Sequence, residues 1–189
     1  LRLDGYKIVL INSKVHHSLA GSEYNVRRKM CGEGLMILES KMNISSFRDI
    51  REPVDILPYR EIMGEEIYDC CKYVVEEIAR TKKAAGLLQQ NDLDGFGKLM
   101  YETHEGLSKL YRVSCAELDF LVEQARLDNN VTGSRQMGGG FGGCTISIIK
   151  EEAVNDFIEE VKAAYKKQFS ITAEAYIVET ADATKRIEV

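Results

Sequence analysis

The chain has 189 residues, of which 44% are hydrophobic and 29% charged, an ordinary composition for a folded globular domain. Twenty-five basic and thirty acidic residues give a formal net charge of -5, which argues against a general nucleic-acid binder because such proteins carry a basic surplus. Aliphatic runs are short, as at residues 8–11, whereas a membrane span needs roughly 18 apolar residues. We therefore expect neither a nucleic acid nor a membrane as a partner.

The cysteines indicate the cellular compartment of the protein, and the first residues indicate whether the chain is part of a longer one. The chain has five cysteines, an odd number without a CxxC spacing, and this favours reduced thiols in a cytoplasmic protein over a disulfide framework or a metal site. No signal peptide is visible. Because the chain opens on Leu1 and soon enters a buried-strand pattern, we expect it to be a piece of a longer protein.

The first third of the chain predicts one strand and two helices. The apolar run over residues 7–12 predicts a buried strand. Ser22 is a candidate N-cap for a helix that runs to about residue 41. An irregular stretch over residues 43–60 holds both prolines, and helical spacing resumes over residues 61–88.

The remainder of the chain predicts further helices and then strands. Asn91–Asp92 is a candidate helix start, and Ser114 with Glu117 forms an S-x-x-E capping box before another helix. The predicted elements that follow are strand 131–137, strand 144–149, helix 151–169 and strand 175–179. This order indicates an α+β fold, a split β-α-β (ferredoxin-like) plait with a small, mostly antiparallel sheet and additional helices, in one domain over residues 1–189.

A glycine-rich run is the most informative segment of the sequence. Its residues are Gly138, Gly139, Gly140, Phe141, Gly142 and Gly143. Glycines permit positive φ and bring backbone N–H groups close to an anion or a sugar. A tight turn would explain some of them, but five around one aromatic favour a functional loop. The run formally contains GxGxxG, but a strand follows it where a dinucleotide fingerprint needs a helix, and no GK[ST] follows for a Walker A loop.

The segment Gly133–Thr145 resembles the third conserved motif of the GHMP small-molecule kinases, and its Phe-Gly-Gly-Cys ending is most similar to the galactokinase branch. The family usually has Met-Thr where this chain has Gln136-Met137. Residues 11–28 and 96–121 resemble two further stretches of that branch, and Asp182 lies in a similar closing tail. The second stretch has the branch's residues at His104, Ser114, Cys115, Glu117 and Asp119.

The resemblance implies the C-terminal portion of a galactokinase, an enzyme that transfers the γ-phosphoryl group of ATP to the C1 hydroxyl of α-D-galactose. The family's sugar motif, phosphate loop, magnesium ligands and catalytic aspartate lie N-terminal to this portion, and their motifs do not occur in this chain. We therefore expect no catalytic residue here, ATP and Mg²⁺ ligands mainly in the absent N-terminal domain, and an isolated chain without activity. The alternatives are a non-catalytic galactose and ATP sensor, a kinase of N-acetylgalactosamine, or a plait-like binding module without kinase history.

The resemblance also assigns individual residues. It implies that the hydroxyl of Tyr24 hydrogen-bonds the galactose ring hydroxyls. It implies that the loop Gly138–Gly143 packs against the missing phosphate loop and shapes the site. His16 is a candidate for a nucleotide contact.

Three other residues have simpler interpretations. Arg27 and Arg28 could reach phosphates, but arginines on a helix more often pair with carboxylates such as Glu23. His104 is interpreted as a structural hydrogen-bonding residue.

Overall fold

The computed structural model describes residues 3–15 and 20–180. Its helices and strands are β1 Tyr6–Asn12, α1 Ala20–Glu39, α2 Arg60–Met63, α3 Glu65–Gln89, α4 Leu93–Lys109, α5 Ala116–Leu127, β2 Val131–Met137, β3 Cys144–Lys150, α6 Val154–Phe169 and β4 Glu174–Val178. Three short 3₁₀ helices lie at Phe47–Asp49, Pro53–Tyr59 and Glu151–Ala153. Every helix in the described part of the chain is too short or too polar to span a bilayer.

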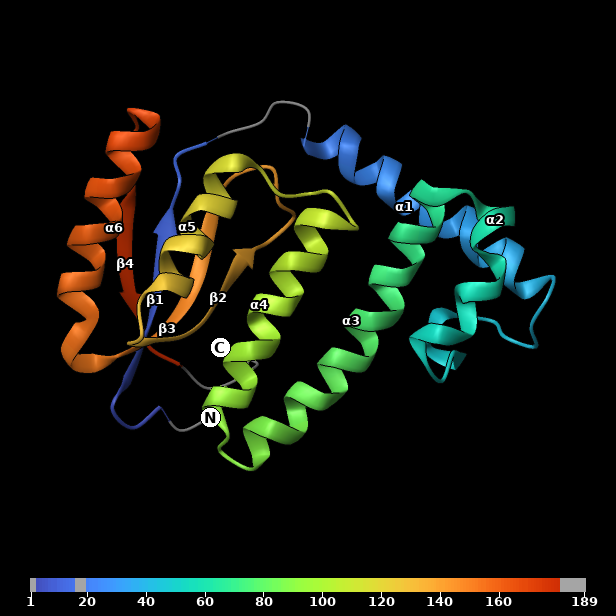
Figure 1. Ribbon diagram of the computed structural model, residues 1–189, viewed down its shortest axis with the longest axis horizontal. Helices are drawn as coiled ribbons and strands as arrows, with labels where there is room; N and C mark the ends of the chain where they lie inside the picture. The colour runs from blue at the N-terminus through green and yellow to red at the C-terminus, as the bar shows by residue number, and fades with distance from the viewer. Residues whose placement is uncertain (1–2, 16–19, 181–189) are drawn as a thin grey trace, which may run out of the picture.

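The four strands form one sheet in the order β2-β3-β1-β4, and every neighbouring pair is antiparallel. Helices α5 and α6 cover one face of this sheet (Figure 1). A β-α-β-β-α-β succession with this strand order is the split β-α-β plait, with α1 to α4 as the additional helices. The α+β expectation is therefore confirmed.

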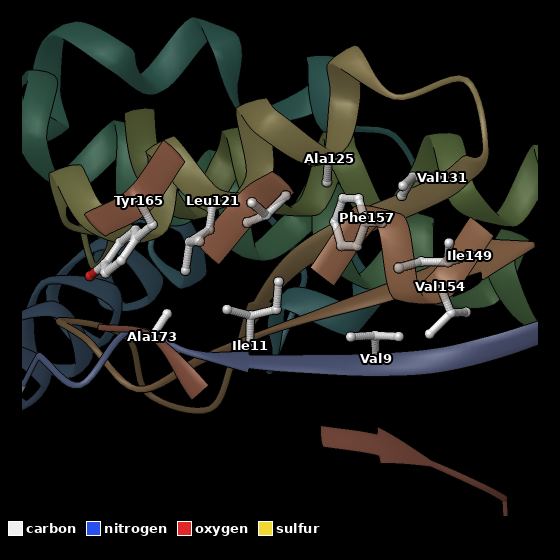
Figure 2. Packing of buried hydrophobic residues seen from close by; sticks show 11 residues of the cluster. Val9, Ile11, Leu121, Ala125, Val131, Ile149, Val154, Phe157, Tyr165 and Ala173 are labelled. Carbon is white, nitrogen blue, oxygen red and sulfur yellow. The ribbon is translucent and has the colours of Figure 1, made fainter. Parts of the chain in front are cut away.

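The core between the sheet and its two covering helices is apolar (Figure 2). Its buried residues are Val9, Ile11, Leu121, Ala125, Val131, Ile149, Val154, Phe157, Val161, Tyr165 and Ala173. Aromatic rings close one side, where Phe169 meets Phe120 edge-on with centroids 5.3 Å apart and lies 5.0 Å from Tyr165. These contacts fix α5 and α6 on the sheet because burial of large apolar side chains is the main stabilising contribution.

The remaining helices extend the fold sideways from the sheet. In Figure 1, α4 lies beside β2, α3 packs on α4, and α1 packs on the far side of α3. A second apolar cluster fills the space among α1, α3 and the segment before α2; its buried residues are Leu38, Ile50, Ile56, Met63, Tyr68, Cys71 and Val75. This arrangement leaves the start of α1 on the same edge of the molecule as the end of β1 (Figure 1).

Several predicted element boundaries are wrong. The helix predicted over residues 61–88 is two helices, because Gly64 has φ +74° and interrupts the turn between α2 and α3. Ser22 is not an N-cap, since α1 already begins at Ala20. The prediction of a helix start at Asp92 is confirmed, because its carboxylate accepts the Gly95 N–H at 2.8 Å.

The capping box predicted from Ser114 and Glu117 is also wrong. Helix α5 begins at Ala116, with Cys115 at the N-cap position and no side-chain cap hydrogen bond. The Ser114 hydroxyl donates instead to Asp119 at 2.6 Å. The Ser114 hydroxyl therefore donates to a side chain, and the N-cap residue makes no side-chain hydrogen bond to the first turn of α5.

Candidate functional site

The glycine loop, residues 138–143, joins β2 to β3 at the upper edge of the sheet in Figure 1. The strands close just before it, with Met137 opposite Cys144. Positive φ angles occur at Gly138, Gly140, Phe141, Gly142 and Gly143. An L-residue rarely adopts this conformation, so the glycine content of the loop is a requirement of its backbone path.

Hydrogen bonds hold the loop on two sides. On one side, the Phe141 N–H donates to the Val113 carbonyl at 2.7 Å. On the other side, both the N–H and the Oγ of Ser13 donate to the Gly143 carbonyl at 2.8 Å, and the Gly143 N–H donates to Val15 at 3.3 Å. The amides of Phe141 and Gly143 are therefore committed to holding the loop in place.

The inner and outer parts of the loop have different surroundings. A Cβ atom added to Gly140 would collide with the Val113 carbonyl, and one added to Gly142 would collide with the Val15 carbonyl. A Cβ atom on Gly138 or Gly139 would meet nothing within 4 Å. The inner part is thus packed against backbone, while the outer part lies at an open surface.

The start of α1 is tied to the same edge of the molecule. The Arg27 Nε donates to the Tyr111 carbonyl at 2.8 Å, and its Nη2 lies 3.6 Å from Glu23. Tyr111 and Val113 both belong to the connection between α4 and α5, so this connection anchors both α1 and the glycine loop. Tyr24 lies near the start of α1, one turn before Arg27, and is 48% exposed.

These contacts test the interpretations of the arginines that were based on the sequence. Arg27 pairs with the carboxylate of Glu23, as interpreted, and also reaches a backbone carbonyl. Arg28 is exposed. His16 lies outside the described residues. No residue type in the sequence indicates the anchoring roles of Val113 and Val15, because both act through backbone carbonyls.

A buried polar network lies beneath the loop. His104 is 5% exposed, and its Nδ1 accepts the Gln136 N–H at 3.2 Å. Its Nε2 lies 3.1 Å from Oδ1 of Asp119. Asp119 also accepts hydrogen bonds from Ser114 at 2.6 Å and from Ser108 at 2.9 Å. The interpretation of His104 as a structural hydrogen-bonding residue is confirmed.

The network determines the charge of Asp119. Partial burial raises the pKa of this carboxyl, but the contacts with His104, Ser114 and Ser108 outweigh that effect and hold the pKa below its ordinary value. Asp119 is therefore a carboxylate at neutral pH and accepts the hydrogen bonds of Ser114 and Ser108. The His104 Nε2 lies close to it but has no hydrogen-bond partner among the described residues.

The five cysteines are all free thiols. The neighbours Cys70 and Cys71 are buried in α3, and burial raises their pKa values to about 11 and about 12. Such thiols stay protonated and pack as small apolar groups. Within residues 3–15 and 20–180, no group of three His, Cys, Asp or Glu side chains is placed to hold a metal ion.

Comparison with known proteins places this arrangement in a class. Residues 84–167 match the sequence profile of the family described as GHMP kinases C terminal. The crystal structure of Lactococcus lactis galactokinase complexed with galactose superposes with a TM-score of 0.88 at 29% identity, covering 93% of this chain and 45% of that one. The crystal structure of L. major mevalonate kinase in complex with R-mevalonate shares the fold alone, with a TM-score of 0.52 at 18% identity.

Residues 84–167 are therefore similar to the C-terminal domain of the GHMP kinases. The chain is similar over nearly its whole length to galactokinases: 41% identical over 188 residues to that of Clostridium acetobutylicum, and 35% identical over 189 residues to that of Bacillus subtilis. The chain spans about half the length of these curated relatives, 48% in both cases. It corresponds to their C-terminal half.

Proposed function

We propose that this chain is the C-terminal half of an enzyme that transfers the γ-phosphoryl group of ATP to the C1 hydroxyl of galactose. The proposal rests on one arrangement: α1 and the glycine loop are both anchored to the segment between α4 and α5, at one open edge of the molecule. The fold in which they lie is similar throughout to galactokinases. Phosphoryl transfer depends mostly on positioning and charge stabilisation. A rigid half that forms one wall of a cleft between two domains would contribute to the positioning of the substrates.

Tyr24 is the proposed sugar-binding residue of this half. Its side chain is half exposed on α1, so its hydroxyl is available to a ligand at this edge. The tie between Arg27 and Tyr111 fixes the helix one turn further along, which limits the orientations that Tyr24 can adopt. A hydroxyl held in this way would hydrogen-bond the ring hydroxyls of galactose.

The glycine loop is proposed to shape the site and not to bind phosphate directly. Two of its amides, at Phe141 and Gly143, already donate to carbonyls of this chain. The open outer part at Gly138 and Gly139 can accept a close neighbour, and we assign that place to the phosphate loop of the N-terminal half. His16 keeps its candidate role as a nucleotide contact.

The other components of the reaction are assigned by the same resemblance. ATP and Mg²⁺ would be bound mainly by the N-terminal domain, which would also supply the catalytic aspartate. Bound Mg²⁺ would neutralise charge on the phosphates. Residues 1–189 would form a single domain of a cytoplasmic enzyme, a location that five free thiols support.

The test is ATP-dependent sugar phosphorylation by the full-length protein that contains this chain. Galactose and N-acetylgalactosamine are offered in parallel, and Tyr24→Phe is compared with the wild type. If the Tyr24 hydroxyl meets the sugar, its loss costs about 1–3 kcal/mol of transition-state stabilisation in kcat/KM. Tyr59→Phe is the matched control, because Tyr59 packs against the second apolar cluster, which includes Leu38 near the C-terminal end of α1.

The outcomes separate the candidate functions. Galactose turnover that falls in Tyr24→Phe and not in Tyr59→Phe supports the proposal. Turnover of N-acetylgalactosamine alone would reassign the sugar. No turnover of either sugar, with galactose still bound, would contradict the enzyme and favour the sensor.

A further inference from the structure

We propose that Asp119 is a positioning residue for the glycine loop, acting through two separate chains of contacts that both end on the loop. The proposal goes beyond the function proposed above, on which it rests only for its kinetic test. Asp119 belongs to the first turn of α5, and its side chain faces a pocket of about 690 Å³ among α4, α5 and α6. It acts on the loop through other residues, since among the described residues its carboxylate has Ser108, Ser114 and His104 as polar neighbours and no hydrogen bond to residues 138–143.

The first chain of contacts runs through His104. The Nδ1 of this imidazole accepts the Gln136 N–H, so the proton of the neutral ring is on Nε2, which lies 3.1 Å from Oδ1 of Asp119. The Gln136 N–H therefore selects the tautomer of His104, and the nearby carboxylate attracts the Nε2–H side of the ring by its charge, without a hydrogen bond of good geometry among the described residues. The ring in turn holds the backbone of β2 two residues before the loop begins at Gly138.

The second chain of contacts runs through Ser114. Its hydroxyl donates to Oδ1 of Asp119 at 2.6 Å, which holds the segment that contains Val113. The Val113 carbonyl accepts the Phe141 N–H at 2.7 Å and is the atom against which Gly140 packs. One carboxylate thus fixes both the strand that enters the loop and the carbonyl on which the middle of the loop rests.

A simpler role for Asp119 is a negative charge at the N-terminus of α5. Ser108 allows the two roles to be distinguished. Its hydroxyl donates to Oδ2 of Asp119 at 2.9 Å, yet Ser108 lies within α4. Val113 is joined to this part of α4 by its own N–H, which donates to the Leu107 carbonyl at 3.0 Å, a backbone bond that Ser108→Ala leaves in place. Removal of the Ser108 or the Ser114 hydroxyl deletes one hydrogen bond to the same carboxylate, but only Ser114 leads to the loop.

The experiment compares Ser114→Ala, Ser108→Ala and Asp119→Asn in the full-length protein. Amide hydrogen exchange at residues 138–143 reports the loop directly, and kcat and KM are measured for the same samples well below their unfolding temperatures. Loss of one hydrogen bond corresponds to about a threefold to tenfold change in an equilibrium. We expect loop exchange to accelerate about tenfold in Asp119→Asn and about threefold in Ser114→Ala, with Ser108→Ala within about twofold of the wild type.

The kinetic constants should follow the same order. We expect kcat to fall about tenfold in Asp119→Asn, with KM for the sugar changed by less than about threefold, because the loop shapes the site without holding the sugar. Equal effects of Ser114→Ala and Ser108→Ala on loop exchange would overturn the proposal. So would a lower unfolding temperature of Asp119→Asn with loop exchange unchanged. If the wild type phosphorylates neither sugar, the proposed function fails, and the exchange measurements still decide the role of Asp119.

Discussion

The helix-facing side of the sheet differs between its two ends. At the end far from the glycine loop, buried residues such as Ile149 and Val131 pack with Phe157 in the apolar core. Towards the loop, the same face carries buried polar side chains. They are Ser13, Ser134, Gln136, Thr145 and Ser147, each at most 1% exposed.

The change occurs at different levels in the three strands. In β2 and β3, the directly opposed pair Val131 and Ile149 gives way to paired polar residues. In β1, the residues opposite these polar positions of β3 are still the apolar Val9 and Ile11, and the polar Ser13 comes only after them. Apolar packing stabilises without directional contacts, whereas hydrogen bonds fix atoms at defined positions. The apolar end of the sheet therefore contributes mainly stability, whereas the polar end holds the backbone next to the glycine loop in a defined position.

The largest effect on stability should come from the apolar end. Phe157 is 2% exposed within the core, so Phe157→Ala should lower the free energy of unfolding by about 3–5 kcal/mol. Urea unfolding measures this value. Leu127→Ala is the control, since Leu127 is 68% exposed and its loss should change stability by less than about 0.5 kcal/mol. Equal effects of the two substitutions would contradict the assignment of the core.

A smaller effect is expected at the polar end. Ser147 Oγ donates to Ser134 Oγ at 2.9 Å in a fully buried pair. Ser134→Ala should cost about 1–3 kcal/mol because it leaves the other hydroxyl without its partner. The double variant with Ser147→Ala should restore most of that loss, and additive losses in the double-mutant cycle would count against a coupled pair.

Gln136→Met should change stability in the opposite direction. Gln136 is fully buried, and within the described residues neither atom of its carboxamide has a hydrogen-bond partner. Methionine has a similar length and no amide to desolvate, so the substitution should raise the free energy of unfolding by about 1 kcal/mol. Thermal unfolding measures the shift. A lower stability would mean that the carboxamide is hydrogen-bonded in solution.

The smallest effect is expected in the pH dependence of stability. The pKa of Asp119 lies below its ordinary value of 3.8 in the folded chain. A lowered carboxyl pKa contributes stability that is present above the unfolded value and is lost as the pH falls through the folded one. The difference in unfolding free energy between the wild type and Asp119→Asn should therefore shrink below about pH 4. A difference that stays constant on acidification would contradict this.

The order of strands and helices could be predicted from the sequence because apolar periodicity follows burial. The strand over 131–137 and the cap at Asp92 agree with the structure. The interruption at Gly64 was missed, because apolar spacing continues across it and only the backbone φ breaks the helix. The start of α5 was misassigned because the hydroxyl of Ser114 has a carboxylate partner within reach, which a local pattern does not weigh.

The candidate site was predictable in part. Its glycines and Tyr24 stand out as residue types, or through the family resemblance. The anchors at Val113, Val15 and Tyr111 act through backbone carbonyls, which any residue supplies, so no residue type reveals them. The proposed role of Asp119 depends on contacts among α4, α5 and the segment between them, and these contacts exist only once the chain has folded.

The most direct test of the account compares Gly140→Ala with Gly139→Ala in the full-length protein. Both substitutions add one methyl group to the same loop, but only the first collides with the Val113 carbonyl at a positive φ. The measurement is the rate of ATP-dependent galactose phosphorylation at equal amounts of folded protein. We predict at least about a hundredfold loss for Gly140→Ala and less than about threefold for Gly139→Ala. Similar activities of the two variants would contradict the claim that the anchored position of this loop determines the function.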